Sequence, residues 1–180
     1  VMGVDTAWGK KGSYSCGVVV DRRTAEQVAE VHGRPELDEL ARVVYKIHEE
    51  YNRAYIMPEW AGDENEGQLA IRKLEELGAR GWLYYRDPER GEKPGFVTSV
   101  TPRPYILGLV KEAVQGRRIV VRSKEGIEEM RGFVRNEEGK PEAVEGMQDD
   151  RVMAWALAMR ALEELPGGDG GKVKVGSYLR

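Results

Sequence analysis

The sequence predicts one α/β domain, built on a mixed sheet of at least five strands with helices on both faces. Hydrophobic residues alternate with a period of two through much of residues 1–32, which is typical of strands. From residue 35 the period changes to 3.6, and helical segments then alternate with short apolar runs. No helix separates the first three strands, so we expect them to be antiparallel. A length of 180 residues with 41% hydrophobic residues suffices for a single core.

Five short apolar segments have the composition of strands of the main sheet. They are residues 1–5, 14–20, 27–32, 54–57 and 82–85. We expect the third to be an edge strand and the fourth to be buried. Asp5 ends the first of these segments, and Glu59 follows the fourth after a proline. A further short strand is predicted over residues 118–122, and a turn-rich connection or hairpin over residues 136–146.

Five segments have helical periodicity. They are residues 35–51, 65–77, 104–115, 123–133 and 152–165. Pro35 is suited to a helix start because its missing N–H has no helical partner there. Leu40 and Val44 then lie on one helical face. Ser123 is the expected N-cap of the fourth helix. The fifth is apolar nearly all round, which predicts a helix buried against the sheet.

Composition excludes several classes of protein. Cys16 is the only cysteine, which excludes internal disulfides and cysteine-based zinc sites. No apolar run approaches the roughly 20 residues of a membrane helix, and no signal-peptide pattern opens the chain. We expect a domain over residues 1–166 and a flexible tail over residues 167–180. The start at Val1, inside a strand, is typical of a piece of a longer protein. Abundant Glu and Arg beside scarce Asn and Gln indicate a thermophilic source.

Acidic residues stand where two predicted strands end and where the last helix begins. Asp5 and Glu59 would meet if the first and fourth strands are neighbours, and Asp149 or Asp150 could join them from the helix. Clustered carboxylates repel one another, and Mg²⁺ or Mn²⁺ relieves that repulsion. Two such ions can promote phosphodiester hydrolysis. Taken singly, the helix acids could instead be caps, Asp5 a turn residue and Glu59 an exposed loop acid.

Two stretches carry a resemblance to a known family. Residues 3–9 read GVDTAWG, and residues 148–158 read QDDRVMAWALA. With the acid after the fourth strand, they resemble the nuclease domain of phage large terminase subunits, and the similarity extends over roughly residues 1–161. This family has a ribonuclease-H-like fold and cuts concatemeric DNA during genome packaging. The resemblance therefore implies a ribonuclease-H-like sheet and a metal-dependent endonuclease that cuts double-stranded DNA with little sequence specificity.

The resemblance also implies a site for two divalent ions, Mg²⁺ or Mn²⁺. Asp5 would bridge the ions, Glu59 would hold one, and an acid of the last helix would hold the other. Asp150 is favoured over Asp149 as the direct ligand, with Asp149 as a supporting or additional catalytic acid. The same resemblance implies an ATPase motor domain in the full-length protein, contacts with a portal and a small terminase subunit, and a viral protein in the host cytoplasm.

Basic residues near the predicted site are candidates for contacts with DNA phosphates. They are Lys10, Lys11, Arg103 and Lys124. Ordinary solvated surface charge is the alternative for each of them. The net charge of −3 argues against a protein that coats DNA, although it leaves room for a local basic groove.

Other functions remain open at this point. A Holliday-junction resolvase or a ribonuclease H would share the fold, whereas a docking module of that fold would have lost its metals. An actin-like or sugar-kinase ATPase also begins with Asp and a glycine-bearing loop. His32 and His48 are not accompanied by the Asp and Ser residues of a catalytic triad, and both are predicted to be surface residues. Cys16 and Trp155 are predicted to be core residues.

Overall fold

A five-stranded mixed sheet forms the centre of the molecule, with the strand order β3-β2-β1-β4-β7. In this computed structural model, the described residues are 1–6, 14–60, 67–86, 93–98, 102–135, 139, 141–144 and 146–165. The sheet strands are β1 (Met2–Asp5), β2 (Ser15–Val20), β3 (Gln27–Gly33), β4 (Ile56–Trp60) and β7 (Phe96–Val97). The first three are antiparallel, β4 is parallel to β1, and β7 is parallel to β4. The predicted mixed sheet, with β3 at its edge, is confirmed.

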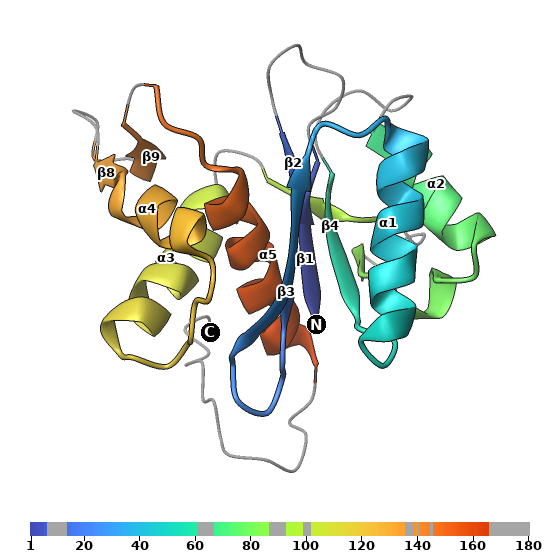
Figure 1. The fold of residues 1–180 in the computed structure, drawn as a ribbon, viewed down its shortest axis with the longest axis horizontal. Coiled ribbons are helices and arrows are strands. Elements are labelled where there is room, and N and C mark those ends of the chain that lie inside the picture. Colours follow the sequence, from blue (N-terminus) through green and yellow to red (C-terminus); the bar gives the residue numbers. More distant parts are fainter. Residues whose placement is uncertain are drawn as a thin grey trace.

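Helices cover both faces of the sheet (Figure 1). On one face lie α1 (Leu37–Glu50) and α2 (Gly67–Glu76). On the other lie α3 (Pro102–Gln115), α4 (Lys124–Arg131) and α5 (Asp150–Glu164). Each face has its own hydrophobic cluster, and α5 is the centre of one of them. No helix in the described part of the chain is long and apolar enough to span a membrane.

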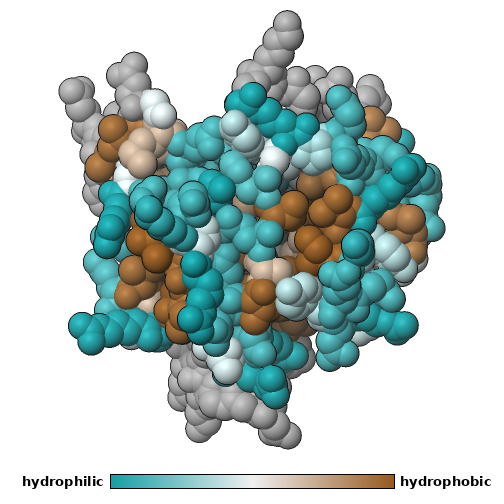
Figure 2. Space-filling view, in the orientation of Figure 1, coloured by the Kyte–Doolittle hydropathy of each residue, from teal (hydrophilic) through white to brown (hydrophobic). Residues whose placement is uncertain are grey.

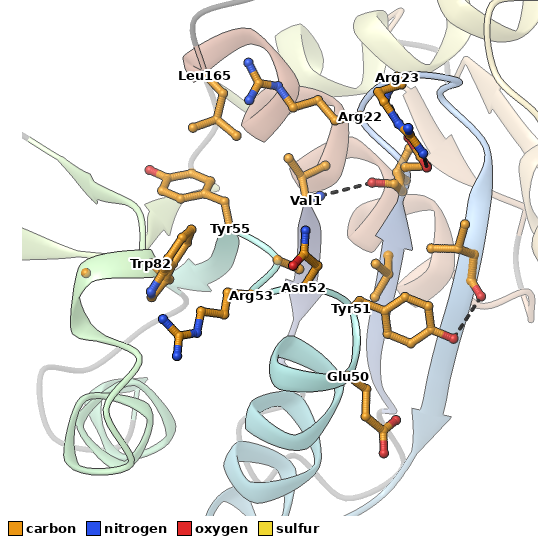
Figure 3. A pocket seen from close by; sticks show the side chains of 16 residues that line it. Val1, Arg22, Arg23, Glu50, Tyr51, Asn52, Arg53, Tyr55, Trp82 and Leu165 are labelled. Carbon is orange, nitrogen blue, oxygen red and sulfur yellow. Dashed lines mark hydrogen bonds and ion pairs between the residues drawn. The ribbon is translucent and has the colours of Figure 1, made fainter. Parts of the chain in front are cut away.

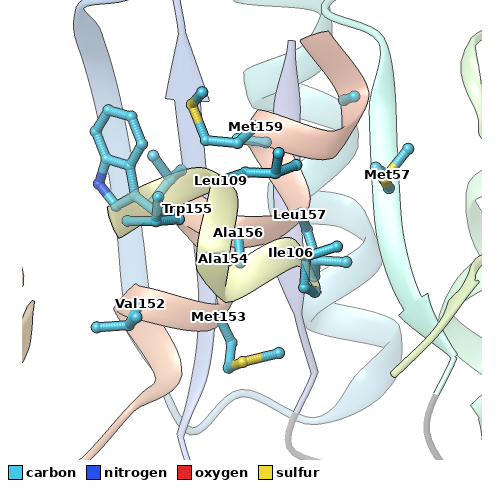
Figure 4. Packing of buried hydrophobic residues seen from close by; sticks show 14 of the residues in the cluster. Met57, Ile106, Leu109, Val152, Met153, Ala154, Trp155, Ala156, Leu157 and Met159 are labelled. Carbon is cyan, nitrogen blue, oxygen red and sulfur yellow. The ribbon is translucent and has the colours of Figure 1, made fainter. Parts of the chain in front are cut away.

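Helix α5 is buried because it lies between the sheet and α3, so apolar residues are needed around most of its circumference. Trp155, Leu157 and Met159 point to different sides of this helix in Figure 4, and each is 1% exposed or less. Toward β1, the backbone of α5 comes so close that a Cβ atom built on Gly3 would stand 2.0 Å from the carbonyl oxygen of Ala154. The absence of a side chain at Gly3 therefore sets how closely α5 approaches the strand that ends in Asp5.

The predicted fifth strand over residues 82–85 is wrong. A 3-10 turn, η1 (Arg80–Trp82), occupies its start, and Leu83 makes only an isolated bridge to β4. Beyond it, β5 (Tyr85–Arg86) pairs with β6 (Lys93–Pro94) in a separate ribbon. The fifth strand of the sheet is β7, which at two residues is too short to produce a periodic signal.

Two further local predictions differ from the structure. Residues 118–122 form no strand; Val120 makes an isolated bridge to Glu26. His48 is not a surface residue but only 1% exposed, because it continues the buried α1 stripe of Leu40 and Val44 at four-residue spacing. Its Nδ1 lies 2.8 Å from the carbonyl oxygen of Ala54, which satisfies that buried nitrogen.

The connection before α5 folds as predicted, and so does the start of α4. Strands β8 (Phe133–Arg135) and β9 (Pro141–Ala143) form an antiparallel hairpin. Ser123 is the N-cap as expected, because its hydroxyl accepts a hydrogen bond of 3.0 Å from the backbone N–H of Gly126.

Hydrophobic side chains interrupt the hydrophilic surface on both sides of the central sheet in Figure 2. The exposed hydrophobic residues of the described chain include Val28 on β3 and Val114 on α3.

Candidate metal centre

Asp5 and Glu59 lie at the same end of two adjacent parallel strands. The register pairs Val4 of β1 with Pro58 of β4, so the residues that follow them stand side by side. Asp5 is 9% exposed and Glu59 is 7% exposed, and their carboxyl groups share a hydrogen bond. Thr98, next to β7, donates a short hydrogen bond from its hydroxyl to Glu59. The first and fourth strands are therefore neighbours, which is the condition set above for these two acids to meet.

The N-terminus of α5 brings two further acids to the same place. Asp149 is the N-cap residue and Asp150 is the first residue of the helix. The Asp149 side chain makes no capping hydrogen bond, and it pairs instead with the guanidinium of Arg103 from α3. Both helix acids act electrostatically on Asp5. The structure thus gathers Asp5, Glu59, Asp149 and Asp150 around one end of the sheet.

The cluster is predominantly negative, although the guanidinium of Arg103 pairs with Asp149 and His32 lies near Asp150. Burial, the hydrogen bond to Glu59 and the negative charges of Glu59, Asp150 and Asp149 raise the pKa of Asp5 well above its usual range. Burial and the charge of Asp149 also raise the pKa of Asp150, while His32 acts in the opposite direction. A divalent cation is the partner that would let all of these carboxylates ionise together.

The chemistry of the donor set fits such a cation. Carboxylate oxygens are hard ligands of the kind that Mg²⁺ and Mn²⁺ prefer. Two buried polar atoms in the same region, Oγ1 of Thr6 and Nε2 of His32, have no hydrogen-bond partner among the residues that the structure describes. Among the described residues no three His, Cys, Asp or Glu side chains already converge as ligands of one ion. Binding of an ion would require Asp5 to ionise, against the raised pKa of its carboxyl group.

A polar network fixes the end of α5 that carries the two acids. Arg151 donates from Nε to Glu30 of β3 at 2.8 Å and from Nη1 to Glu129 of α4 at 2.5 Å. The backbone N–H of Arg151 also donates to the Glu129 carboxylate at 2.9 Å. Glu129 therefore caps α5 from a neighbouring helix, and the Ser123 hydroxyl donates to Glu30 at 3.1 Å to complete the network. These contacts position Asp150 relative to the sheet.

Replacement of Glu129 by alanine is expected to destabilise the protein by roughly 2–4 kcal/mol, because it leaves a partly buried guanidinium and a helix N-terminus without their partner. Denaturant unfolding measures this loss. Glu128→Ala is the matched control, since the Glu128 side chain is 56% exposed and, within the described residues, its ion pair is a 4.0 Å contact with Lys124. Equal stability of the two variants would contradict the role given to Glu129.

The basic residues proposed to contact DNA are placed unevenly. Arg103 lies beside the acids through its ion pair with Asp149. Lys124 begins α4 with a side chain that is 84% exposed and lies 4.0 Å from Glu128 of its own helix. Lys10 and Lys11 fall outside the described residues. Contact with DNA phosphates stays a prediction for all four.

Sequence reasoning missed His32, whose prediction as a surface residue is wrong. Its side chain is 14% exposed, and Nε2 lies 3.7 Å from the carboxylate of Asp150. The strand register contains the signal that could have found it. Asp5 pairs with Cys16, and Cys16 pairs with His32, so the three residues form one row across β1, β2 and β3. Cys16 is fully buried, as predicted, and so is Trp155.

A separate hollow lies near the opposite end of β1, around Val1 (Figure 3). Aromatic side chains of Tyr55 and Trp82 and the guanidinium group of Arg53 line it. None of the four clustered acids belongs to its lining. The acidic site and this hollow are therefore separate sites on the molecule.

The mixed sheet of this strand order gives the chain the ribonuclease-H-like fold predicted for it, and its solved structural neighbours are nuclease domains of phage large terminases. The nuclease of the thermophilic phage G20c with bound cobalt aligns with a TM-score of 0.69 and 20% identity, over 88% of this chain and 79% of that one. The Thermus phage P74-26 domain aligns with a TM-score of 0.65 and 23% identity, over 96% of this chain and 83% of that one. The bacteriophage SPP1 domain with bound Mn aligns with a TM-score of 0.50 and 16% identity, over 89% of this chain and 84% of that one.

Other forms of the G20c nuclease contain bound magnesium or zinc. No protein-family model matches this chain, and no curated protein matches it by sequence. The expected likeness to terminase nucleases is confirmed at the level of fold.

Proposed function

We propose that this chain is a metal-dependent endonuclease that cuts double-stranded DNA with little sequence specificity. The observation that carries the proposal is the meeting of Asp5, Glu59 and Asp150, three acids distant in sequence, at one end of the sheet. Structural neighbours that are nucleases with bound metals support it. The biological substrate we propose is concatemeric viral DNA that is cut during genome packaging.

Two divalent ions, Mg²⁺ or Mn²⁺, are proposed to supply an activated water and to stabilise the leaving oxygen. Asp5 would hold both ions, Glu59 one and Asp150 the other, with Asp149 in support. The neighbouring residues prepare these ligands. Thr98 orients Glu59, and Arg151 fixes the helix turn that carries Asp150. Such positioning matters because a ligand displaced by 1 Å no longer reaches its ion.

Further partners follow from the proposed role. We propose that the nuclease is one part of a full-length large terminase with an ATPase motor domain, and that it works with a portal and a small terminase subunit in the host cytoplasm. Lys10, Lys11, Arg103 and Lys124 are proposed to contact DNA phosphates. The release of counterions from these contacts would make DNA binding weaken as salt increases.

Cleavage of a supercoiled plasmid tests the proposal. We expect nicked and linear products with Mn²⁺ or Mg²⁺, and none with EDTA. Asp150→Asn should reduce cleavage by at least about a hundredfold, since each 1.36 kcal/mol of lost stabilisation costs a factor of ten. Asp38→Asn makes the same chemical change at an exposed position of α1 and should leave cleavage unchanged.

Persistent cutting in EDTA or by the Asp150→Asn variant would contradict the proposal. A four-way junction and an RNA–DNA hybrid, offered beside the plasmid, separate the alternatives with the same fold. Preference for the junction would indicate a resolvase, and preference for the hybrid would indicate a ribonuclease H. Failure to cut any of the three substrates with any ion would favour a non-catalytic docking module.

A further inference from the structure

The imidazole of His32 reaches the acidic site from the edge strand β3. It stands in the same cross-strand row as Asp5, two strands away, and its Nε2 lies 3.7 Å from the Oδ2 atom of Asp150. Among the described residues this buried nitrogen has no partner within 3.5 Å, and Asp150 is its ion-pair partner at the longer distance. A buried polar atom without a hydrogen-bond partner is unusual in a folded protein and calls for an explanation.

Aromatic stacking holds the imidazole in this orientation. The ring of Tyr14 lies 4.6 Å from that of His32, centre to centre, and the two planes differ by only 10°. The guanidinium of Arg34 lies 4.0 Å above the Tyr14 ring, so the guanidinium and the imidazole both stack on this ring. This arrangement restricts rotation of the imidazole about its side-chain bonds. Nε2 is therefore presented to Asp150 by an ordered structure.

The spacing between His32 and Asp150 has a specific chemical meaning. A distance of 3.7 Å is too long for a hydrogen bond. Two ligand atoms that each lie about 2.1 Å from a shared ion stand roughly 3–4 Å apart. Neutral imidazole is also a common metal ligand in proteins. The gap therefore has the size expected between two ligands of one divalent ion.

We propose that His32 is a ligand residue of the metal centre and that its Nε2 binds the ion held by Asp150. This inference rests on the proposed metal-dependent function and assigns one of its ligands. A nitrogen ligand favours transition-metal ions over Mg²⁺, which prefers oxygen ligands. The position beside Asp150 would then prefer Mn²⁺ to Mg²⁺, whereas a site of carboxylates alone would lack that bias.

Pulsed electron paramagnetic resonance of the Mn²⁺-loaded chain tests this assignment without measuring activity. A directly bound imidazole produces ¹⁴N modulation of the Mn²⁺ echo. We expect this modulation in the unmodified chain and its loss in His32→Ala. Titration should show Mn²⁺ affinity falling by about tenfold or more, with a smaller change for Mg²⁺. His32→Gln fills more of the volume and removes the imidazole as well, so it serves if the alanine variant fails to fold.

The second histidine provides an internal control. His48 is buried in α1 against Ala54, so His48→Gln should keep the ¹⁴N modulation. Modulation that survives in His32→Ala would overturn the assignment. Tight Mn²⁺ binding without any ¹⁴N modulation would overturn it too, while leaving the proposed metal-dependent function intact. Absence of Mn²⁺ binding in the unmodified chain would overturn both.

Discussion

Replacement of Asp5 by asparagine is expected to abolish plasmid cleavage and, at the same time, to raise the melting temperature of the metal-free protein. The carboxyl group is buried among other acids, which raises its pKa well above the ordinary value of 3.8. The folded state therefore resists its ionisation, and the resulting loss of stability grows as the pH rises above about 4 toward that raised pKa. Asparagine keeps the shape of the side chain but removes this loss at neutral pH.

The loss of activity should be large because Asp5 is the proposed ligand of both ions. Loss of several kcal/mol of metal-derived stabilisation corresponds to a decrease of roughly a thousandfold or more in cleavage rate. Plasmid cleavage and thermal unfolding, each with and without Mn²⁺, measure the two effects. The ion should stabilise the unmodified chain strongly and the Asp5→Asn variant weakly, by the linkage of binding to folding.

Asp38→Asn, at the exposed site used above, controls for a general effect of lost negative charge. Two results would count against this account of Asp5. One is a metal-free Asp5→Asn variant that is less stable than the unmodified chain, which would mean that the hydrogen bond to Glu59 outweighs the electrostatic strain. The other is cleavage at the unmodified rate, which would place the catalytic ions elsewhere.

A single methyl group on Gly3 is expected to damage both the fold and the metal centre. The Cβ atom of Gly3→Ala would lie 2.0 Å from the carbonyl oxygen of Ala154 and 2.4 Å from the backbone nitrogen of Ala158. Because these are backbone atoms, α5 must move away from β1 as a unit. We expect a loss of about 3 kcal/mol or more in the free energy of unfolding, at the upper end of overpacking effects.

Movement of α5 would also carry Asp150 away from Asp5, so Mn²⁺ affinity should fall together with stability. Gly108→Ala is the matched control, since in the described structure a Cβ built at that position in α3 has no contact within 4 Å beyond the adjacent backbone of its own helix. The same substitution there should raise stability by about 0.5–1 kcal/mol, because alanine favours the helix over glycine. A Gly3→Ala variant as stable as the unmodified chain would show that α5 does not require this close approach.

Patterns within short segments of the sequence were sufficient to predict much of the architecture. Alternation through residues 1–32 predicted β1, β2 and β3, and 3.6-residue periodicity predicted the helices, including buried α5. Ser123 was recognisable as an N-cap because capping depends on a side chain and the backbone three residues later. The position of the acids at the ends of strands and helices could be predicted in the same way, because neighbouring residues in the sequence determine where a strand or helix ends.

Contacts between distant segments could not be read from these patterns. The two residues of β7 join the sheet only because they pair with the edge of β4. His48 is buried because it lies on the apolar face of α1, which packs toward the sheet. Arg103 pairs with Asp149, and Glu129 caps α5, through helices that meet only in the folded chain. No short-range periodicity records such pairings.

The sequence by itself determined which residues are acidic, which segments form strands and helices, and where those acids stand along them. The tertiary structure alone decided that β1 and β4 are parallel neighbours and that Gly3 admits α5 close to the sheet. It also decided that His32, across two strands, faces Asp150. The physical reason is that secondary structure follows short-range sterics and hydrophobic periodicity, whereas a metal centre depends on register and packing between segments that the chain brings together only on folding.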